Sequence, residues 1–298
     1  MTTTTVNTTP KKRKVKGGAA RWWAQVGWKH IFAVFFIVYC IFPLLYVLSA
    51  ALNPGGTLTG SNELFRTISF DNFGKLMGTN FWKWFGHSMY VSGVTAIATV
   101  LMAASAAYAF SRFRFKGRHG GLTALMIVQM FPQMLAMVAV FLLLLGIRDV
   151  LPAIGLGEHL GLIFVYLGGA LGANTFLMYG FFNTLPRELD EAAKIDGATH
   201  AQIFWGIIMR LVSPILAVVG LLSFVGSYGE FVLARIVLQR PENYTLAVGL
   251  YDWASDERNA PWSLFAAGAV LTAIPIIVLF MFLQKYIVSG LTAGGVKG

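Results

Sequence analysis

Cysteine and charged residues are scarce in this 298-residue sequence. Cys40 is the only cysteine, so the chain can form neither an intrachain disulfide nor a metal centre built from several thiolates. Charged residues make up 12% of the sequence, against 56% hydrophobic residues. A soluble protein of this length needs more polar surface to cover its core. The composition therefore predicts a polytopic membrane protein.

Signatures of catalysis are also missing from the sequence. It contains no GxSxG elbow, HExxH motif or dinucleotide fingerprint, and no two of its five histidines have the helical spacing of metal ligands. The GxxxxGK[ST] loop that cradles nucleotide phosphates is missing too. We therefore expect no enzyme activity and no bound cofactor or metal. If ATP drives this protein, ATP and magnesium must bind to a partner.

Six apolar segments are long enough to cross a bilayer, which takes about 20 mostly apolar residues. The sequence predicts these spans at 31–52, 85–110, 122–146, 160–182, 211–237 and 264–286. The expected fold is an all-α membrane protein with six transmembrane helices. A basic segment at 1–30 precedes the transmembrane domain at 31–286, and a tail at 287–298 follows it.

Lysine and arginine predict the orientation of these spans. The segment 1–30, the loops 111–121 and 183–210, and the tail from Lys285 carry 16 of the 23 basic residues. Basic residues accumulate on the cytoplasmic side of membrane proteins. Both termini are therefore expected in the cytoplasm. The opposite side would hold the remaining connections.

One basic string, Pro-Lys-Lys-Arg-Lys-Val at 10–15, looks like a nuclear or nucleic-acid-binding signal. It lies about 15 residues before the first span, within the distance at which basic residues influence orientation. Attraction to anionic lipid adds about 1 kcal/mol per basic residue near the surface. The position of this string favours contact with membrane lipid, and we expect no nucleic-acid partner.

Two further features concern the membrane region. Trp82 and Trp84 precede the second span, which suits the aromatic belt at a membrane surface. Glu230 is the carboxylate that falls within a predicted span. Intramembrane acids can mark an ion pathway, but a polar residue facing a partner subunit or a water-filled cavity fits the pattern better.

The loop at 183–210 has the strongest local signals in the chain. Pro186 suits a first helical turn, and Gly197 suits the left-handed residue that ends a helix. Thr199 and Gln202 have the spacing of a capping box, so a second helix can start at once. We therefore expect two short helices joined at a sharp turn.

The first of these helices has the chemistry of a docking element. Leu189, Ala192 and Ala193 are expected on one face, where small side chains allow close approach of another protein, and Glu191 and Asp196 supply charges for a basic groove. An amphipathic helix on lipid head groups is the alternative, although such helices usually favour Lys and Arg.

Glu191-Ala192-Ala193 followed by Gly197, before the penultimate span, resembles the EAA motif of ABC-importer permeases. The resemblance implies a type I permease architecture in which this loop docks on an ATPase subunit and couples ATP use to movement of the spans. The usual Leu-Pro after the glycine is replaced by Met209-Arg210. Carried over, the coupling residues are Glu191, Ala192, Ala193, Asp196, Gly197 and Ala198.

Two other stretches, Asn243–Gly249 and 290–298, resemble the smaller membrane subunits of maltose and maltodextrin importers. This likeness implies that the tail reaches the ATPase interface and that the region before the last span faces a sugar-binding protein. The tail residues are Gly294, Gly295, Val296 and Lys297. The binding-protein residues are Asn243, Tyr244, Asp252, Trp253 and Trp262.

The sequence therefore predicts a permease subunit of a bacterial carbohydrate importer, in the inner membrane. The resemblance implies maltose, maltodextrin or a related α-glucoside such as trehalose as the substrate. It also implies a second, different permease subunit, two ATPases and an extracytoplasmic sugar-binding protein as partners. Two alternatives stay open, namely an ion-coupled carrier that uses Glu230 and a non-transporting membrane scaffold.

Overall fold

The computed structural model describes residues 22–54, 64–255 and 260–295, and these residues form helices and connections without a β-strand. The longer helices are α2 (Trp28–Ala51), α4 (Phe81–Arg112), α5 (Arg118–Met130), α6 (Met137–Val150), α7 (His159–Phe182), α11 (Ser213–Tyr228) and α14 (Trp262–Gly295). The shorter helices are α3 (Asp71–Leu76), α8 (Glu188–Ile195), α9 (His200–Gln202), α10 (Met209–Leu211), α12 (Val232–Val237) and α13 (Leu246–Ala254). Single turns are η1 (Trp23–Gly27), η2 (Gln133–Ala136), η3 (Pro152–Ile154), η4 (Ile203–Ile208) and η5 (Pro241–Asn243).

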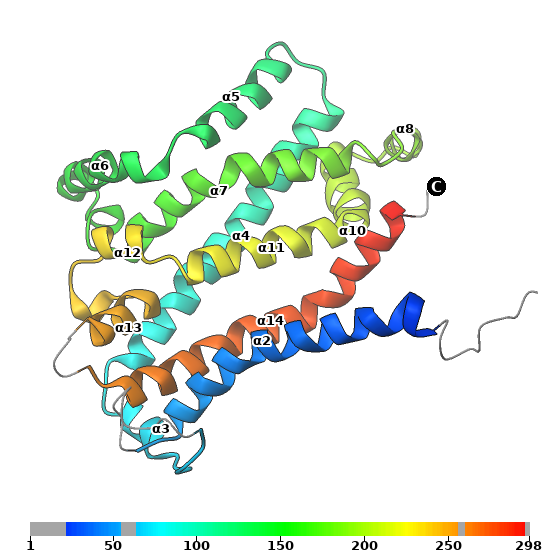
Figure 1. Ribbon diagram of the computed structural model, residues 1–298. Helices are drawn as coiled ribbons and strands as arrows, with labels where there is room; N and C mark the ends of the chain where they lie inside the picture. The colour runs from blue at the N-terminus through cyan, green and yellow to red at the C-terminus, as the bar shows by residue number, and fades with distance from the viewer. Residues whose placement is uncertain (1–21, 55–63, 256–259, 296–298) are drawn as a thin grey trace, which may run out of the picture.

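The centre of the molecule is the long helix α4, which packs against α7 and α11 (Figure 1). Helix α14 joins this group along α11. The buried side chains form two clusters, one near each end of α4. The cluster around Tyr108 and Phe182 also contains Ala193 of α8, so the loop 183–210 is built onto the core.

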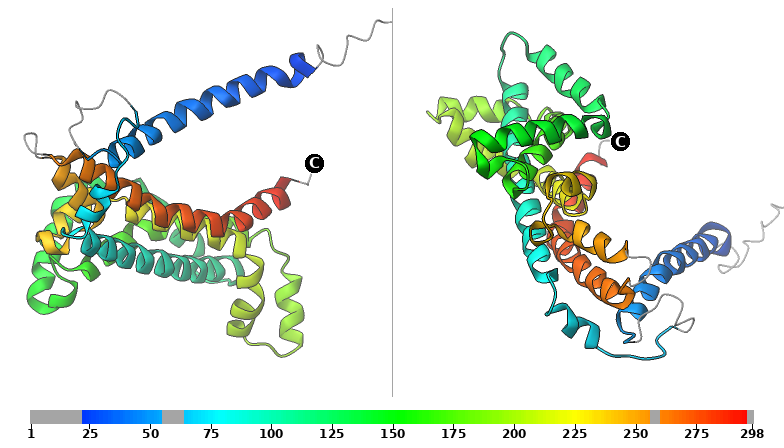
Figure 2. Two further views of the ribbon diagram at one scale, coloured as in Figure 1. Left: turned by 90° about the horizontal axis from the view of Figure 1, so that it is seen from below. Right: turned by 90° about the vertical axis from the view of Figure 1, so that its left-hand side faces the viewer.

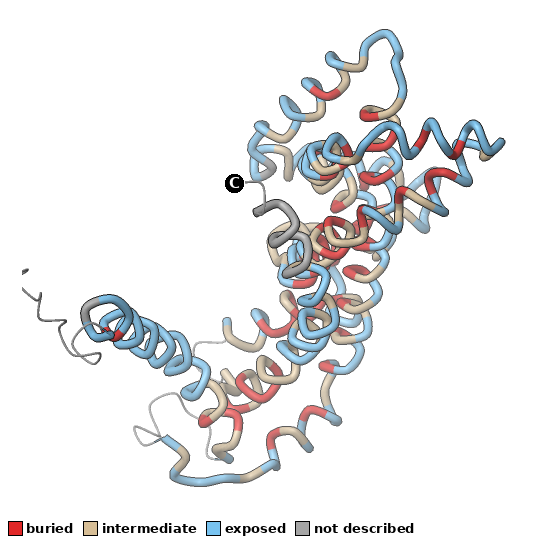
Figure 3. Tube along the Cα trace, turned by 90° about the vertical axis from the view of Figure 1, so that its right-hand side faces the viewer, coloured by how far each residue is buried: buried red, intermediate tan, exposed pale blue. Residues whose placement is uncertain are grey.

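Helix α2 stands away from this core. Its main contacts are with α14 and with η1, and Figure 2 shows that it meets the rest of the chain near its C-terminal end. Large apolar side chains from Ile31 to Leu44 are exposed, and the helix is almost entirely pale blue in Figure 3. An apolar helix of this length therefore leaves most of its surface to lipid or to another subunit.

Four of the six expected spans are continuous helices. They are α2, α4, α7 and α14, each long and apolar enough to cross a membrane. The structure holds up to six such crossings if each of two bent helix pairs counts as one. An all-α membrane fold is thus confirmed, while the number of spans depends on how the bent pairs sit in the bilayer.

The expected continuous helix at 122–146 is wrong. The chain bends by 81° between α5 and α6. Phe131 is extended, with φ −71° and ψ 126°, and Pro132 follows it. Proline disfavours a helical conformation in the preceding residue and has no amide hydrogen to donate, so it ends α5.

The expected continuous helix at 211–237 is wrong as well. The helix from His200 to Leu211 meets α11 at 79°, and α11 starts with Pro214 in its first turn. Helix α11 then ends at Tyr228, and α12 begins only at Val232. The fifth segment is therefore interrupted at Glu230.

The described chain ends and helix α8 lie at one end of the molecule, whereas α3 and α13 lie at the other (Figure 1). Trp22 and Gly295 mark these chain ends. The loops 111–121 and 183–210, which are rich in Lys and Arg, meet at the end that carries α8. This arrangement is compatible with the orientation that the sequence predicts, with both termini in the cytoplasm.

The sequence predicted that Trp84 belongs to an aromatic belt at the membrane surface, and this prediction is wrong. Helix α4 starts four residues earlier than expected, at Phe81, and carries Trp84 into the core, where it is 4% exposed. Its indole Nε1 donates to the Pro241 carbonyl oxygen at 2.7 Å. Trp82 is 43% exposed and keeps the expected surface position.

Candidate functional site

The turn between α8 and α9 has the geometry that its sequence predicts. Gly197 has a φ of +83°, the left-handed conformation that favours glycine. The Gly197 amide donates to the Lys194 carbonyl at 3.0 Å, and the Ala198 amide donates to the Ala193 carbonyl at 2.9 Å. This pair of bonds is the Schellman motif, which satisfies the last carbonyls of α8.

A capping box starts the next helix immediately, as predicted. The Gln202 amide donates to Thr199 Oγ1 at 3.3 Å, and the Thr199 amide donates to Gln202 Oε1 at 2.8 Å. Two helix ends are therefore satisfied within five residues. The direction in which α8 leaves the core is fixed by local hydrogen bonds.

Helix α8 presents one face to solvent and the other to its own chain. Glu191, Ala192 and Asp196 are exposed, and Leu189 is 40% exposed. Ala193 is 9% exposed and packs in the core cluster beside Tyr108 and Phe182, so its expected place on the docking face is wrong. The spacing of three residues between Asp190 and Ala193 puts both on the inner face.

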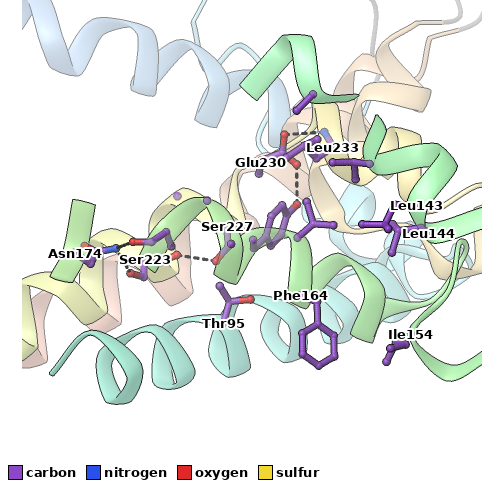
Figure 4. A pocket seen from close by; sticks show the side chains of 18 of the residues that line it. Thr95, Leu143, Leu144, Ile154, Phe164, Asn174, Ser223, Ser227, Glu230 and Leu233 are labelled. Carbon is purple, nitrogen blue, oxygen red and sulfur yellow. Dashed lines mark hydrogen bonds between the residues drawn. The ribbon is translucent and has the colours of Figure 1, made fainter. Parts of the chain in front are cut away.

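A second candidate site is a cavity of about 740 Å³ between α6, α7, α11 and α12. Most of its lining is apolar, and Figure 4 shows a row of polar side chains along one wall. Its polar residues are Thr95, Tyr166, Asn174, Ser223, Ser227 and Glu230. The hydroxyl of Thr95 is buried without a hydrogen-bond partner in the described part of the chain.

Glu230 stabilises the break in the fifth segment. Its Oε1 accepts the Leu233 amide at 2.8 Å, and its Oε2 accepts the Ala234 amide at 3.0 Å and the Tyr166 hydroxyl at 2.7 Å. A carboxylate at a helix N-terminus satisfies free amides and interacts favourably with the helix dipole. The side chain faces the cavity, as predicted, but both oxygens are already bonded within the chain (Figure 4).

Comparison with known proteins identifies the class of this molecule. Residues 99–293 match the family model described as the inner membrane component of binding-protein-dependent transport systems. The chain belongs to this family. As a family member it is a permease component that resides in the inner membrane, and its role in transport is non-enzymatic.

Several curated permeases resemble the chain over nearly their full length. The galactooligosaccharides transport system permease GanQ of Bacillus subtilis is 41% identical over 90% of this chain and 94% of its own. The maltodextrin permease MdxG of the same organism is 39% identical over 90% and 95%. The maltose/maltodextrin permease MalG of Escherichia coli K12 is 38% identical over 90% and 95%.

A solved structure shares the fold. It is a bacterial ABC transporter involved in the import of alginate, and one of its chains matches with a TM-score of 0.74 at 23% identity. The match covers 93% of this permease component and 99% of that chain. The arrangement of helices around α4 is therefore that of an ABC-importer permease.

The permease residues expected to meet a binding protein divide into buried and exposed groups. Tyr244 is 5% exposed, and its hydroxyl accepts a hydrogen bond from Arg235, so an exposed position for it is wrong. Asn243 donates from Nδ2 to the Gly157 carbonyl at 3.2 Å. Asp252 is exposed and lies 3.5 Å from Arg235.

The two tryptophans of this group are half-buried. The Trp253 ring packs at a tilt against the Trp84 ring, with 5.2 Å between ring centroids, and Trp262 is the first residue of helix α14. The stretch before the last span contains a helix, α13. The exposed residues of α13 are Tyr251 and Asp252.

The tail residues are only partly within the described structure. Gly294 and Gly295 form the end of α14, so the helix continues past the expected end of the span at 286. Val296 and Lys297 lie outside the described residues. Their predicted place at an ATPase interface stays a prediction.

Sequence reasoning missed one pair of side chains. The rings of His87 and His159 lie 4.3 Å apart, although they stand far apart in the sequence. Nδ1 of His87 lies 3.2 Å from the Tyr244 carbonyl oxygen, and Nε2 of His159 lies 2.9 Å from that of Asn243. Among the described residues no three metal-ligating side chains converge. These histidines therefore fasten η5 onto α4 and α7.

Proposed function

We propose that this chain is one of two different permease subunits in an ABC-type importer of maltose, maltodextrin or a related α-glucoside. The observation that carries the proposal is the identity of 38–39% to maltodextrin and maltose permeases over 90% of the chain. The similar identity to a galactooligosaccharide permease makes a galactooligosaccharide the second candidate.

Helix α8 is proposed to dock on an ATPase subunit that binds ATP and magnesium. Its exposed side chains, Glu191 and Ala192, and Asp196 after it, offer negative charge and a small surface for close approach. Gly197 and Ala198 hold the turn behind them. The tail from Gly294 to Lys297 is proposed to reach the same ATPases.

The second permease subunit is proposed to cover helix α2. Exposed apolar side chains line this helix, and its attachment to the rest of the chain is confined to one end (Figure 2). The proposed topology has six spans and both termini in the cytoplasm, and α8 would then lie on the ATPase side of the membrane. Helix α13, with exposed Asp252, would then face the sugar-binding protein outside.

Reconstitution tests this function directly. Proteoliposomes that contain both permeases and the ATPases, with the binding protein outside, should take up labelled maltotriose only with internal ATP. Collapse of the proton gradient should leave uptake unchanged. Uptake driven by that gradient without ATP would instead support a carrier that uses Glu230. Competition by unlabelled galacto-oligosaccharide, maltose and trehalose ranks the substrates.

A matched pair of variants tests docking by α8. Glu191→Lys should abolish ATP-dependent uptake, because it reverses a charge on the exposed face. Glu188→Lys changes an exposed acid on the same helix outside the proposed contact and should transport normally. Equal uptake by the two variants would contradict the assigned docking face, and loss of ATPase copurification with Glu191→Lys would locate the defect.

A further inference from the structure

Helix α8 is fastened to the end of α4 by a buried ion pair. Nε of Arg112, the last residue of α4, lies 2.6 Å from Oδ2 of Asp190 in α8. The side chains of Arg112 and Asp190 are 6% and 8% exposed. Solvent and salt weaken an exposed pair much more than a buried one. This pair therefore acts at short range with little screening.

Two hydrogen bonds tie the loop that leads into α8 to the same end of α4. Nη2 of Arg112 donates to the Leu185 carbonyl at 3.3 Å, and Nη2 of Arg187 donates to the Ser111 carbonyl at 3.0 Å. Each of these two segments thus supplies an arginine to the other. Tyr108 of α4 packs in the same cluster as Ala193 of α8. The polar contacts and the apolar contacts join α8 to one end of one helix.

We propose that Arg112 and Asp190 are positioning residues that make α8 and the adjoining end of α4 move as one rigid unit during transport. This inference rests on the proposed function, because it supposes that α8 docks on an ATPase. The displacement imposed on α8 then passes into α4 through the buried pair, and the hydrogen bonds of Leu185 and Arg187 hold the preceding loop to the same end of α4.

Helix α4 is suited to carry such a displacement across the molecule. It is 32 residues long, which corresponds to about 48 Å at 1.5 Å per residue. Near its other end, Trp84 donates to the Pro241 carbonyl, and Ser88 Oγ accepts the Leu246 amide at 2.7 Å. One rigid helix therefore joins α8 to η5 and α13, where the binding protein is proposed to sit.

The ionic nature of the pair is itself informative. Well-packed apolar residues often replace a buried ion pair without loss of stability, whereas removal of one partner leaves a costly buried charge. An ion pair also restricts the relative position of its two helices, because its opposite charges must stay close together in a buried site. A coupling element needs such a restricted position more than it needs extra stability.

The first experiment measures sugar transported per ATP hydrolysed by the full reconstituted complex. Asp190→Asn should lower this ratio by about tenfold, within the usual range for coupling between two sites, while ATP hydrolysis continues. The exchange Arg112→Asp with Asp190→Arg should restore it. Glu188→Gln, on the exposed face of α8, is the control and should match the wild type.

Three results of this experiment have fixed meanings. An unchanged ratio in an assembled Asp190→Asn complex overturns the inference, and so does a ratio that stays low in an assembled exchange variant. A wild-type complex without ATP-driven uptake contradicts the proposed function. Failure of the inference about the ion pair can therefore be told apart from failure of the proposed function, because the former is seen in preparations whose wild-type complex transports sugar.

A second experiment keeps the ion pair intact and so does not depend on the folding of its variants. Spin labels at Ser105→Cys in α4 and Lys194→Cys in α8, both exposed positions, in a Cys40→Ser background report the distance between the two helices. This distance should be the same in nucleotide-free and ATP-bound complexes that show normal uptake. A shift of the distance between the two states overturns the rigid unit.

Discussion

The left-handed turn at Gly197 permits a graded test of the coupling element. A Cβ added at this position would meet no atom within 4 Å, so a substitution costs only backbone strain at φ +83°. That strain is about 1–2 kcal/mol for an ordinary L-residue and smaller for asparagine. Valine should cost more than alanine, because its branched Cβ crowds the backbone. The expected order of destabilisation is Val, Ala, Asn.

This strain acts on the Schellman bonds that join α8 to the turn. A cost of 1–2 kcal/mol corresponds to about a 5–30-fold change in a local equilibrium. Amide hydrogen exchange over residues 188–202 in the purified complex measures this equilibrium. Gly197→Ala should lose protection by that factor, and Gly197→Asn should remain close to the wild type. Sugar transported per ATP should fall in the same order.

Gly206 provides the matched control. It is also a glycine with open space around a built Cβ, but it lies in the helical turn η4 at an ordinary φ. Alanine there should preserve protection or raise it, because it favours helix over glycine by about 1 kcal/mol. Equal protection in Gly197→Val and Gly197→Asn would refute the reasoning from backbone strain.

Three further substitutions test other contacts through the thermal stability of the purified complex. Glu230→Ala removes the acceptor of three hydrogen bonds and should cost about 1–2 kcal/mol, whereas Tyr166→Phe removes one bond and should cost about 1 kcal/mol. Gly249→Ala places a Cβ in a clash with the Trp84 ring and should cost about 1–3 kcal/mol, with a shift in tryptophan fluorescence. Thr199→Ala should cost about 1 kcal/mol and increase hydrogen exchange at the start of α9. Unchanged melting in any of these variants would contradict the corresponding contact.

The sequence predicted the turn from α8 to α9 well because its interactions are local. Gly197, Thr199 and Gln202 bond within a few residues of themselves, so their spacing alone specifies the geometry. The apolar runs likewise predicted the four continuous helices. Both kinds of prediction need only neighbouring residues or average composition.

The interrupted segments were missed for two different reasons. Pro132 carried a usable signal, because the residue before a proline favours an extended conformation and a helix often ends there. The hydrophobic run across Pro132 gave the stronger pattern. At Glu230 the signal depends on distant partners. The carboxylate caps α12 through local bonds to the Leu233 and Ala234 amides, but its bond with Tyr166 of α7 spans 64 residues.

The acidic residues of α8 show where local sequence stops being sufficient for a functional site. Glu188, Asp190 and Glu191 are equally acidic in the sequence, and all suit the start of a helix. They differ only in the folded structure. Asp190 is buried against Arg112 of α4, whereas Glu188 and Glu191 are exposed. On the proposed docking helix the two kinds of acid have different roles. Exposed Glu191 can meet a partner, while buried Asp190 ties the helix to the end of α4.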